Sequence, residues 1–223
     1  MASSSKLDRP TIRTVVFDVG ETLVDESREY GSWADWLGVP RHTFSATFGA
    51  VIASGADYRD TFKVFRPGFN LTAEREARAV AGEPESFGES DLYADARPTL
   101  AALQASGLVV GIAGNQTARA EMILRNLNLP ADWITTSEHL GVEKPSPEFF
   151  AAIASLAGCE TSEILYVGDR LDNDISPAQA TGMATVLIRR GPWGHILHDP
   201  ETEARCLATI ASLSELVDLL ASG

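Results

Sequence analysis

Four short polar segments of this sequence hold residue types that together could bind a divalent cation and a phosphoryl group. Asp18 directly follows an apolar run, and Asp169 follows another such run after a single glycine. Asn115 lies just past a third run, and Lys144 occupies a Gly-Val-Glu-Lys-Pro turn in a chain that has few lysines. Carboxylate oxygens are preferred ligands of Mg²⁺, and a lysine or an amide can bind phosphoryl oxygens. These residue types therefore indicate phosphoryl transfer to an aspartate beside a Mg²⁺ site.

These side chains can meet only if the segments before them form one sheet. Apolar runs alternate with segments of helical periodicity along most of the chain. Strands are predicted over residues 14–17, 108–113, 133–136, 164–167, 185–188 and 207–210, and helices over residues 99–106, 117–127, 147–157, 176–181 and 214–220. This alternation predicts an α/β fold, with a Rossmann-like core whose parallel sheet is covered on both faces. Ligands of such sheets bind at the carboxyl ends of the strands, where Asp18 and Asp169 would lie.

The segment that follows the first predicted strand has no strand pattern of its own. Apolar residues recur there at helical spacing from residue 29 to about residue 88. We expect an all-α cap domain over residues 26–91, inserted into an α/β core domain of residues 1–25 and 92–223. Its aromatic side chains are expected to pack within the cap rather than to line a substrate pocket. They include Tyr30, Trp33, Trp36 and Phe44.

Composition and charge limit the class of partner. The chain has 223 residues, of which 44% are hydrophobic, so it can form one mid-sized domain or a core with a smaller insertion. A formal net charge of -13 disfavours nucleic acid and anionic membranes as partners. The expected partner is a small phosphorylated molecule, which would need local positive charge to bind to so acidic a chain. No apolar run approaches the ~20 residues that span a bilayer. The first ten residues lack an apolar signal core, which predicts a cytoplasmic protein, and Cys159 and Cys206 are expected to be reduced thiols.

Nearly the whole chain resembles the haloacid dehalogenase-like hydrolase superfamily, in the subgroup with a helical cap inserted after the first strand. The resemblance rests on Asp18 followed by a Thr-Leu pair, on Lys144 in its turn, and on the Gly-Asp pair at Asp169 followed by Asp174. It implies that Asp18 is the nucleophile and forms an aspartyl-phosphate, with Lys144 as a catalytic, phosphate-binding cation. It also implies a Mg²⁺ ion, whose ligands are Asp18, Asp169 and the backbone carbonyl of Gly20. Asp174 would support that metal site.

Two glycines depart from the pattern of the family's phosphatases. Gly20 stands where these enzymes usually place the aspartate that transfers protons, and Gly114 stands where they usually place a hydroxyl that binds the phosphoryl group, as Asn115 would. General acid–base help contributes typically ~10²–10⁴ in rate, and one hydrogen bond to a charged group contributes about 1.5–3 kcal/mol. We therefore expect weak or specialised turnover, which Gly20→Asp should raise. Glu21 is not expected to replace the missing carboxylate, because an extended chain would point it away from the face of Gly20.

Two other functions stay open. Some branches of the family have no aspartate at the position of Gly20, so a carbon–halogen or phosphonate hydrolase is the alternative enzyme. Dehalogenation needs no metal, so a carboxylate such as Asp169, placed to bind one, makes this alternative less favoured. The phosphonate branch needs an imine-forming cap lysine, for which Lys63 is the sole candidate in the predicted cap. The second alternative is a catalytically impaired protein that binds ligands on the same scaffold.

Several further residues lie outside these motifs. Arg28, Arg59 and Arg66 of the predicted cap could recognise the substrate. Asp172 is expected to be solvent-exposed or a helix cap rather than a metal ligand. Residues 189–194, with the sequence Arg-Arg-Gly-Pro-Trp-Gly, are predicted to form an exposed loop after a strand, at the rim of the site. No feature of the sequence indicates an oligomeric state.

Overall fold

A six-stranded, all-parallel sheet forms the centre of the computed structural model, which describes residues 11–221. The strands are β1 (Thr14–Phe17), β2 (Val109–Gly114), β3 (Trp133–Thr136), β4 (Ile164–Gly168), β5 (Ala184–Ile188) and β6 (Ala208–Ile210). Their order in the sheet is β3-β2-β1-β4-β5-β6. Each predicted strand is confirmed to within one residue at either end. The chain therefore has the α/β fold that its sequence predicts.

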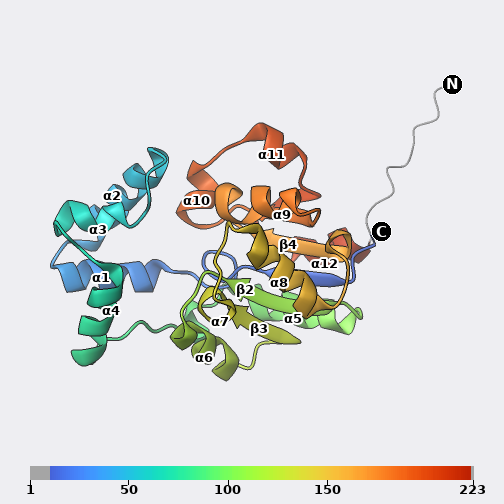
Figure 1. Ribbon diagram of the computed structural model, residues 1–223, viewed down its shortest axis with the longest axis horizontal. Helices are drawn as coiled ribbons and strands as arrows, with labels where there is room; N and C mark the ends of the chain where they lie inside the picture. Colours follow the sequence, from blue (N-terminus) through green and yellow to red (C-terminus); the bar gives the residue numbers. More distant parts are fainter. Residues whose placement is uncertain (1–10, 222–223) are drawn as a thin grey trace.

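Helices cover both faces of this sheet (Figure 1). Outside the insertion described below they are α5 (Ala96–Ala105), α6 (Ala118–Asn126), α7 (Ser137–Leu140), α8 (Pro147–Ala157), α9 (Ser176–Ala180), α10 (Gly191–Ile196), α11 (Pro200–Ala204) and α12 (Glu215–Ala221). Val15 and Phe17 of β1 join one buried cluster with Leu100 of α5, whereas Val16 joins a second cluster with Phe149 of α8. Successive side chains of a strand point to opposite faces. Because both faces are buried, each strand appears in the sequence as a continuous apolar run.

The register of the sheet brings the ends of neighbouring strands to one level. Phe17 of β1 lies beside Ile112 of β2 and beside Val167 of β4. The backbone N–H of Asp18 donates to the carbonyl oxygen of Val167 at 2.9 Å, which extends this pairing by one residue. The residues that follow these strands therefore meet at the edge of the sheet where the strand order reverses, which is the usual place for a ligand.

A helical insertion, α1–α4, connects β1 to the rest of the core. It consists of α1 (Ser27–Leu37), α2 (Arg41–Ala53), α3 (Asp60–Phe65) and α4 (Leu71–Val80), and it lies beside the sheet on the side toward which β1 runs (Figure 1). Aromatic rings form its centre: the Phe62 ring centroid lies 5.4 Å from those of Trp33 and Phe44. Tyr30 and Trp36 pack partly buried against the same cluster. The predicted packing within the insertion is confirmed for Trp33, Trp36 and Phe44, whereas Tyr30 packs there and also lines the cavity described below.

The two segments that connect the insertion to the core run side by side. Val24 and Leu92 form an antiparallel bridge, and the N–H of Asp25 donates to the carbonyl oxygen of Asp91 at 2.8 Å. Arg28, in the first turn of α1, donates to the two carboxylate oxygens of Asp91 at 2.7 and 2.6 Å. The chain thus leaves and rejoins the core at one place, and the pair of Arg28 and Asp91 connects the first turn of α1 to it.

Residues 189–194 do not form the exposed loop that the sequence predicts. They enter α10, where Pro192 occupies the first turn, a position that suits proline, and Trp193 is only 6% exposed. The Trp193 ring centroid lies 5.0 Å from that of Phe48 and 5.8 Å from that of Tyr58. A core tryptophan therefore completes the aromatic cluster of the insertion. The predicted exposure is wrong because Gly and Pro mark both turns and helix starts, and the partners of Trp193 are distant in sequence.

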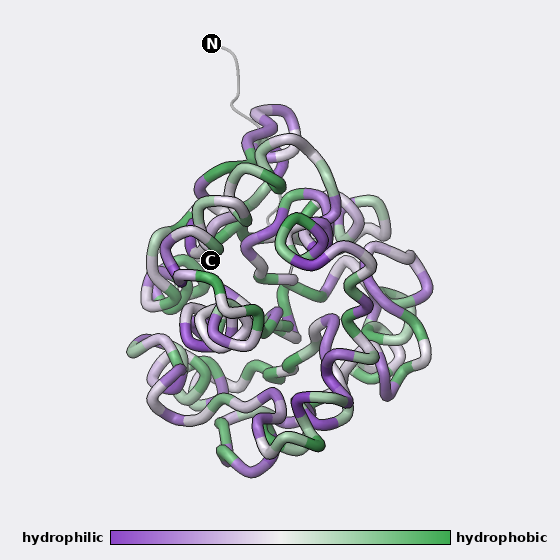
Figure 2. The backbone as a smooth tube through the Cα atoms, turned by 90° about the vertical axis from the view of Figure 1, so that its left-hand side faces the viewer, coloured by the Kyte–Doolittle hydropathy of each residue, from purple (hydrophilic) through white to green (hydrophobic). Residues whose placement is uncertain are grey.

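Hydropathy varies along the outer helices. Figure 2 shows hydrophilic and hydrophobic residues following one another within these helices, as expected for helices that cover a core with one face. None of the helices in residues 11–221 has the length and apolar character that crossing a bilayer requires.

Candidate active site

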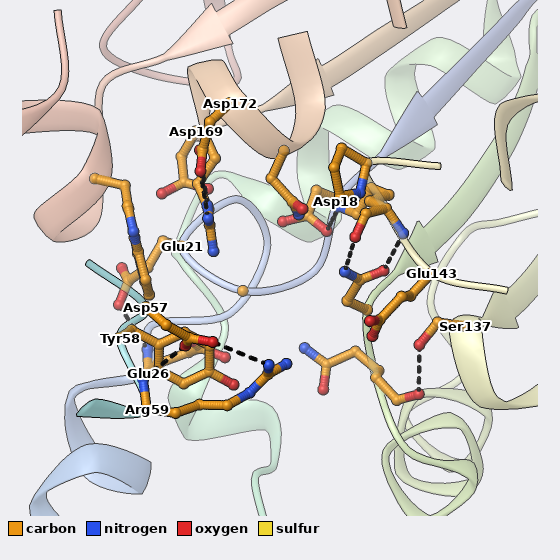
Figure 3. Close-up of a pocket in the computed structure, with 18 of the residues that line it drawn as sticks. Asp18, Glu21, Glu26, Asp57, Tyr58, Arg59, Ser137, Glu143, Asp169 and Asp172 are labelled. Atoms are coloured by element: carbon orange, nitrogen blue, oxygen red, sulfur yellow. Dashed lines mark hydrogen bonds and ion pairs between the residues drawn. The ribbon is translucent and has the colours of Figure 1, made fainter. Parts of the chain in front are cut away.

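A cavity of about 1200 Å³ lies between the carboxyl edge of the sheet and the helical insertion. Asp18 and Asp169 lie on its core side, and Tyr58 and Arg59 line it from the insertion (Figure 3). Of the residues that the sequence places at the site, the cavity is lined by Asp18, Gly20, Asn115, Lys144 and Asp169, whereas Gly114 and Asp174 do not line it. The sheet register thus gathers the predicted residues around one space.

Lys144 is the buried cation of the site. Its Nζ donates to Asp18 Oδ1 at 2.6 Å and to Asp174 Oδ1 at 2.5 Å, and the residue is 3% exposed. Burial alone would lower the pKa of Lys144, but the carboxylates of Asp174 and Asp18 hold it well above its ordinary value. The ammonium is therefore charged, and it fixes one oxygen of each carboxylate.

Asp174 is held from two directions in the turn of π-helix that follows β4 (Leu171–Ile175). Its Oδ2 accepts from the backbone N–H of Arg170 at 3.1 Å, while its Oδ1 accepts from Lys144. Burial raises the pKa of Asp174 to about 6, against the opposing effect of Lys144. A Cβ on Gly168 would lie 2.4 Å from Asp174 Oδ2. The glycine of the Gly-Asp motif therefore makes room for this carboxylate.

Asp169 has one carboxylate oxygen with no hydrogen-bond donor. Within residues 11–221 its Oδ2 is buried and has no hydrogen-bond partner. Burial, together with the charges of Asp174 and Asp18, raises the pKa of Asp169 well above its ordinary value. Asp18, Asp169 and Asp174 each bring an oxygen within 4.8 Å of the others. An orphaned buried oxygen beside two further carboxylates fits a hard cation such as Mg²⁺, which takes oxygen ligands.

Asn115 holds the backbone of Lys144. Its Nδ2 donates to the carbonyl oxygen of Lys144 at 2.8 Å, and its Oδ1 accepts from the N–H of Lys144 at 2.8 Å. These two hydrogen bonds connect the end of β2 to the turn that carries the lysine. The contact of Asn115 with a phosphoryl group stays a prediction, and it would use the second N–H of the amide.

The space beside Gly20 is occupied by Glu26, the residue before α1. A Cβ on Gly20 would lie 2.6 Å from Oε1, 2.8 Å from Cδ and 3.0 Å from Oε2 of Glu26. Burial and the nearby charges of Glu21 and Asp18 raise the pKa of Glu26 well above its ordinary value. Sequence reasoning missed Glu26, because no periodicity connects it with Gly20 and only the path of the turn brings the two together.

The turn after Asp18 is tight rather than extended. The N–H of Glu21 donates to the carbonyl oxygen of Val24 at 2.7 Å, and Glu21 has a left-handed φ of 52°. The extended conformation on which the exclusion of Glu21 rested is therefore wrong. Glu21 Oε2 instead accepts from the Tyr93 hydroxyl at 2.6 Å, and burial raises the pKa of Glu21. This carboxylate already has a hydrogen-bond partner.

Comparison with known proteins identifies the family. Residues 12–182 match the model of the haloacid dehalogenase-like hydrolases. The chain belongs to this family. A glyceraldehyde 3-phosphate phosphatase of Pyrococcus furiosus is 33% identical over an alignment of 228 positions, gaps included, which covers 94% of this chain and 93% of that relative.

Two further comparisons differ in what they cover. A glyceraldehyde 3-phosphate phosphatase of Methanopyrus kandleri is 38% identical over 120 residues, so that this haloacid dehalogenase-like chain spans about half of that relative's length, 52%. The crystal structure of a HAD phosphatase from Thermococcus onnurineus has a TM-score of 0.59 with this chain at 23% identity. The superposition covers 94% of this chain and 98% of that one, and the two share the fold.

Gly114, the second departure from the pattern of the haloacid dehalogenase-like phosphatases, ends β2 directly against Asp18. A Cβ at this position would lie 2.8 Å from Asp18 Oδ1 and 3.1 Å from Val19 Cγ2. A serine or threonine would therefore push against the carboxylate oxygen that Lys144 holds. Gly114 gives Asp18 room for its present position, and it offers no hydroxyl.

The three candidate arginines of the insertion have different surroundings. Arg59 lines the cavity (Figure 3). Arg28 is bound to Asp91, and Arg66 donates to Glu74 at 2.7 Å. Neither Arg28 nor Arg66 is among the described residues that line the cavity. Arg59 is therefore the arginine of the three that can meet a ligand there.

Two other expectations concern residues away from the buried cluster. Asp172 is exposed, as predicted, pairs with Arg170 at 2.7 Å, and lines the cavity. Lys63 is exposed, pairs with Asp60 at 2.7 Å, and is not among the described residues that line the cavity. An imine-forming role for Lys63 therefore has no support from the geometry.

Proposed function

We propose that this haloacid dehalogenase-like hydrolase is a Mg²⁺-dependent phosphatase that acts on a small phosphorylated metabolite through an aspartyl-phosphate on Asp18. One observation carries the proposal: Lys144 bridges Asp18 and Asp174 beside the unpaired buried oxygen of Asp169. That combination suits a substrate that brings negative charge and a metal ion that brings positive charge. Phosphatase names among the relatives support the same reaction.

The roles of the side chains follow from their positions. The free oxygen of Asp18 attacks phosphorus, because Lys144 holds the other carboxylate oxygen in place. The bond from phosphorus to the leaving oxygen then breaks, and water later releases phosphate from Asp18. Lys144 balances charge on the phosphoryl group, and Asp174 keeps Lys144 in position.

Asp18, Asp169 and the backbone carbonyl of Gly20 would hold the metal ion, with support from Asp174. When bound, Mg²⁺ supplies electrostatic stabilisation of the phosphoryl oxygens. The orphaned Oδ2 of Asp169 is the atom of this group that most needs a cation. Its affinity for Mg²⁺ is measurable apart from turnover, by the rise in unfolding temperature that the metal produces.

The organic part of the substrate would occupy the cavity between core and insertion. We assign the insertion to a cap domain over residues 26–91 and the rest to the core, because the two connecting segments bridge at Val24 and Leu92. Arg59 and Tyr58 reach the cavity from that cap. A cytoplasmic location remains a prediction from the sequence.

The first test is phosphate release from a panel of phosphorylated metabolites, with Mg²⁺ and with a chelator in its place. We expect turnover that requires Mg²⁺ and falls at least ~10³-fold in Asp18→Asn. Intact mass after exposure to acetyl phosphate should show one phosphoryl group on the wild type and none on the variant. A wild type that releases no more phosphate than Asp18→Asn would remove the proposal.

A ligand-binding protein without turnover is the second candidate, and the missing side chains at Gly20 and Gly114 favour it. Under that function Mg²⁺ with beryllium fluoride should raise the unfolding temperature although no phosphate is released. Chloride release from 2-chloro acids tests the dehalogenase alternative in the same preparation. We expect none, because the acidic cluster around Asp169 would repel an anionic substrate that brings no metal ion.

A further inference from the structure

Glu26 places a carboxyl group where a side chain of residue 20 would lie. Both oxygens and the carboxyl carbon of Glu26 fall within 3.0 Å of the position of a Cβ on Gly20. The volume that an aspartate at position 20 would fill is therefore already filled, and it is filled by the same chemical group. The site lacks an aspartate at this position but not a carboxyl group.

The path of the chain explains how a residue beyond the turn returns to this place. The N–H of Val24 donates to the carbonyl oxygen of Val19 at 3.0 Å, and Val24 also bridges Gly20. The next residues are held as well, since the N–H of Glu26 donates to Glu21 Oε1 at 3.3 Å. The carbonyl oxygen of Glu26 accepts from the N–H of Tyr30 in the first turn of α1 at 2.9 Å. The backbone of Glu26 is thus fixed on both sides.

The carboxyl group of Glu26 is also free to react. It lines the cavity together with Asp18, and within residues 11–221 it has no hydrogen bond or ion pair to another side chain. Glu21 differs, because its carboxylate is bound by the Tyr93 hydroxyl and by a backbone N–H. Its place beside Gly20 and its lack of a hydrogen-bond partner within the described part of the chain favour Glu26 over Glu21 as a group that reacts in the cavity.

From this geometry we infer that Glu26 is a catalytic residue which transfers protons in place of the aspartate missing at position 20; this inference rests on the proposed phosphatase function. As the bond between phosphorus and the leaving oxygen breaks, the carboxyl proton of Glu26 goes to that oxygen. The resulting carboxylate then takes a proton from the water that attacks phosphorus in the aspartyl-phosphate. Asp18 leaves with its electron pair, phosphate is released, and Glu26 is protonated as at the start.

A series of leaving groups tests this role. For Glu26→Gln we expect kcat on alkyl and phenyl phosphates, which have poor leaving groups, to fall ~10²–10⁴-fold. Phosphorylation of Asp18 by acetyl phosphate should be nearly unchanged, because acetate leaves without a proton. Hydrolysis of the phosphorylated protein should slow, so that intact mass shows it accumulating. Glu76→Gln makes the same chemical change on the exposed face of α4 and should leave all rates at the wild-type level.

The double variant Gly20→Asp/Glu26→Ala distinguishes a catalytic role of Glu26 from a purely structural one. An aspartate at position 20 and the carboxyl group of Glu26 compete for one space, so Gly20→Asp alone should give little gain over the wild type. In the Glu26→Ala background the same change should raise kcat at least ~10-fold. This replaces the earlier expectation that Gly20→Asp raises turnover by itself.

Different results separate the two proposals. An active wild type with Glu26→Gln equally active on phenyl phosphate would overturn the role of Glu26 and leave the phosphatase function standing. Equal gains from Gly20→Asp in the wild type and in Glu26→Ala would overturn it as well, since the two positions would then act independently. A wild type with no more activity than Asp18→Asn would end both proposals.

Discussion

Among the surfaces that line the cavity, strand ends form a first wall, and a turn together with the residue before α1 forms a second. On the first wall Lys144 Nζ lies within 2.6 Å of oxygens from both Asp18 and Asp174, so that each carboxylate is paired with the ammonium group. On the second wall Gly20 has no side chain, and the Glu26 carboxyl group lies beside it without a hydrogen bond to another described side chain. The first wall is a closed network of paired charges, whereas the second holds a carboxyl group that has no such pair among the described residues.

The two walls differ in how strictly the place of a chemical group is tied to one residue of the chain. Sheet register fixes the positions of Asp18 and Asp169, because either residue could move only with its strand. A turn fixes only a region of space, which a side chain from a neighbouring segment can also reach. A glycine in a motif therefore need not mean that the chemical group is missing.

The largest effect should come from opening the closed network. Lys144→Met keeps the aliphatic stem but leaves Asp18 and Asp174 as buried carboxylates without their cation. Removing one partner of a buried ion pair typically costs about 3–5 kcal/mol, and we expect the free energy of unfolding at pH 7 to fall by that amount. Urea unfolding measures it. Lys63→Met, at an exposed lysine, is the matched control and should not change the midpoint; a Lys144→Met midpoint equal to the wild type would contradict the contrast between the walls.

A smaller loss is expected from crowding the same wall. The Cβ of Gly114→Ala would lie 2.8 Å from Asp18 Oδ1, an oxygen that Lys144 prevents from moving freely. Overpacking of this kind costs about 1–3 kcal/mol. Gly49→Ala provides the comparison. Gly49 lies inside helix α2, where alanine is favoured over glycine, and its Cβ would make an ordinary 3.6 Å contact with Ile196. Thermal unfolding should show Gly114→Ala below the wild type and Gly49→Ala at or above it.

The smallest effect concerns the anchor of the second wall, the pair of Arg28 and Asp91. Hydrogen bonds from Arg28 hold the pKa of Asp91 below its ordinary value. A lowered folded-state pKa contributes stability above the ordinary aspartate pKa of about 3.9, and this stability is lost as pH falls through the folded-state value. Asp91→Asn should therefore lower the free energy of unfolding at pH 7, by about 1 kcal/mol or less because Arg28 is half exposed.

The pH series itself provides the check on that pair. The difference between the wild type and Asp91→Asn should shrink as the solution is acidified below pH 4. In an Arg28→Ala background the difference should be smaller at pH 7 and should change less with pH. A difference that is constant over the whole acid range would show that the ion pair does not anchor the insertion.

The sequence predicts the first wall far better than the second. Asp18, Lys144 and Asp169 follow from apolar strands and family motifs, because strand ends in a parallel sheet must meet. Glu26 does not follow, since its place depends on the hydrogen bonds of a tight turn. Trp193 fails for a related reason: it is buried by Phe48 and Tyr58, which no local pattern connects with it.

Trp193 also bears on how the molecule unfolds. By sequence it belongs to the core, yet by packing it belongs to the aromatic cluster of α1–α4, and the guanidinium of Arg170 lies 4.6 Å from its ring. Melting the insertion alone would expose this ring, and melting the core alone would remove one side of the cluster. The two parts therefore share a stabilising contact, and we read them as a single cooperative unit that loses its structure in one transition.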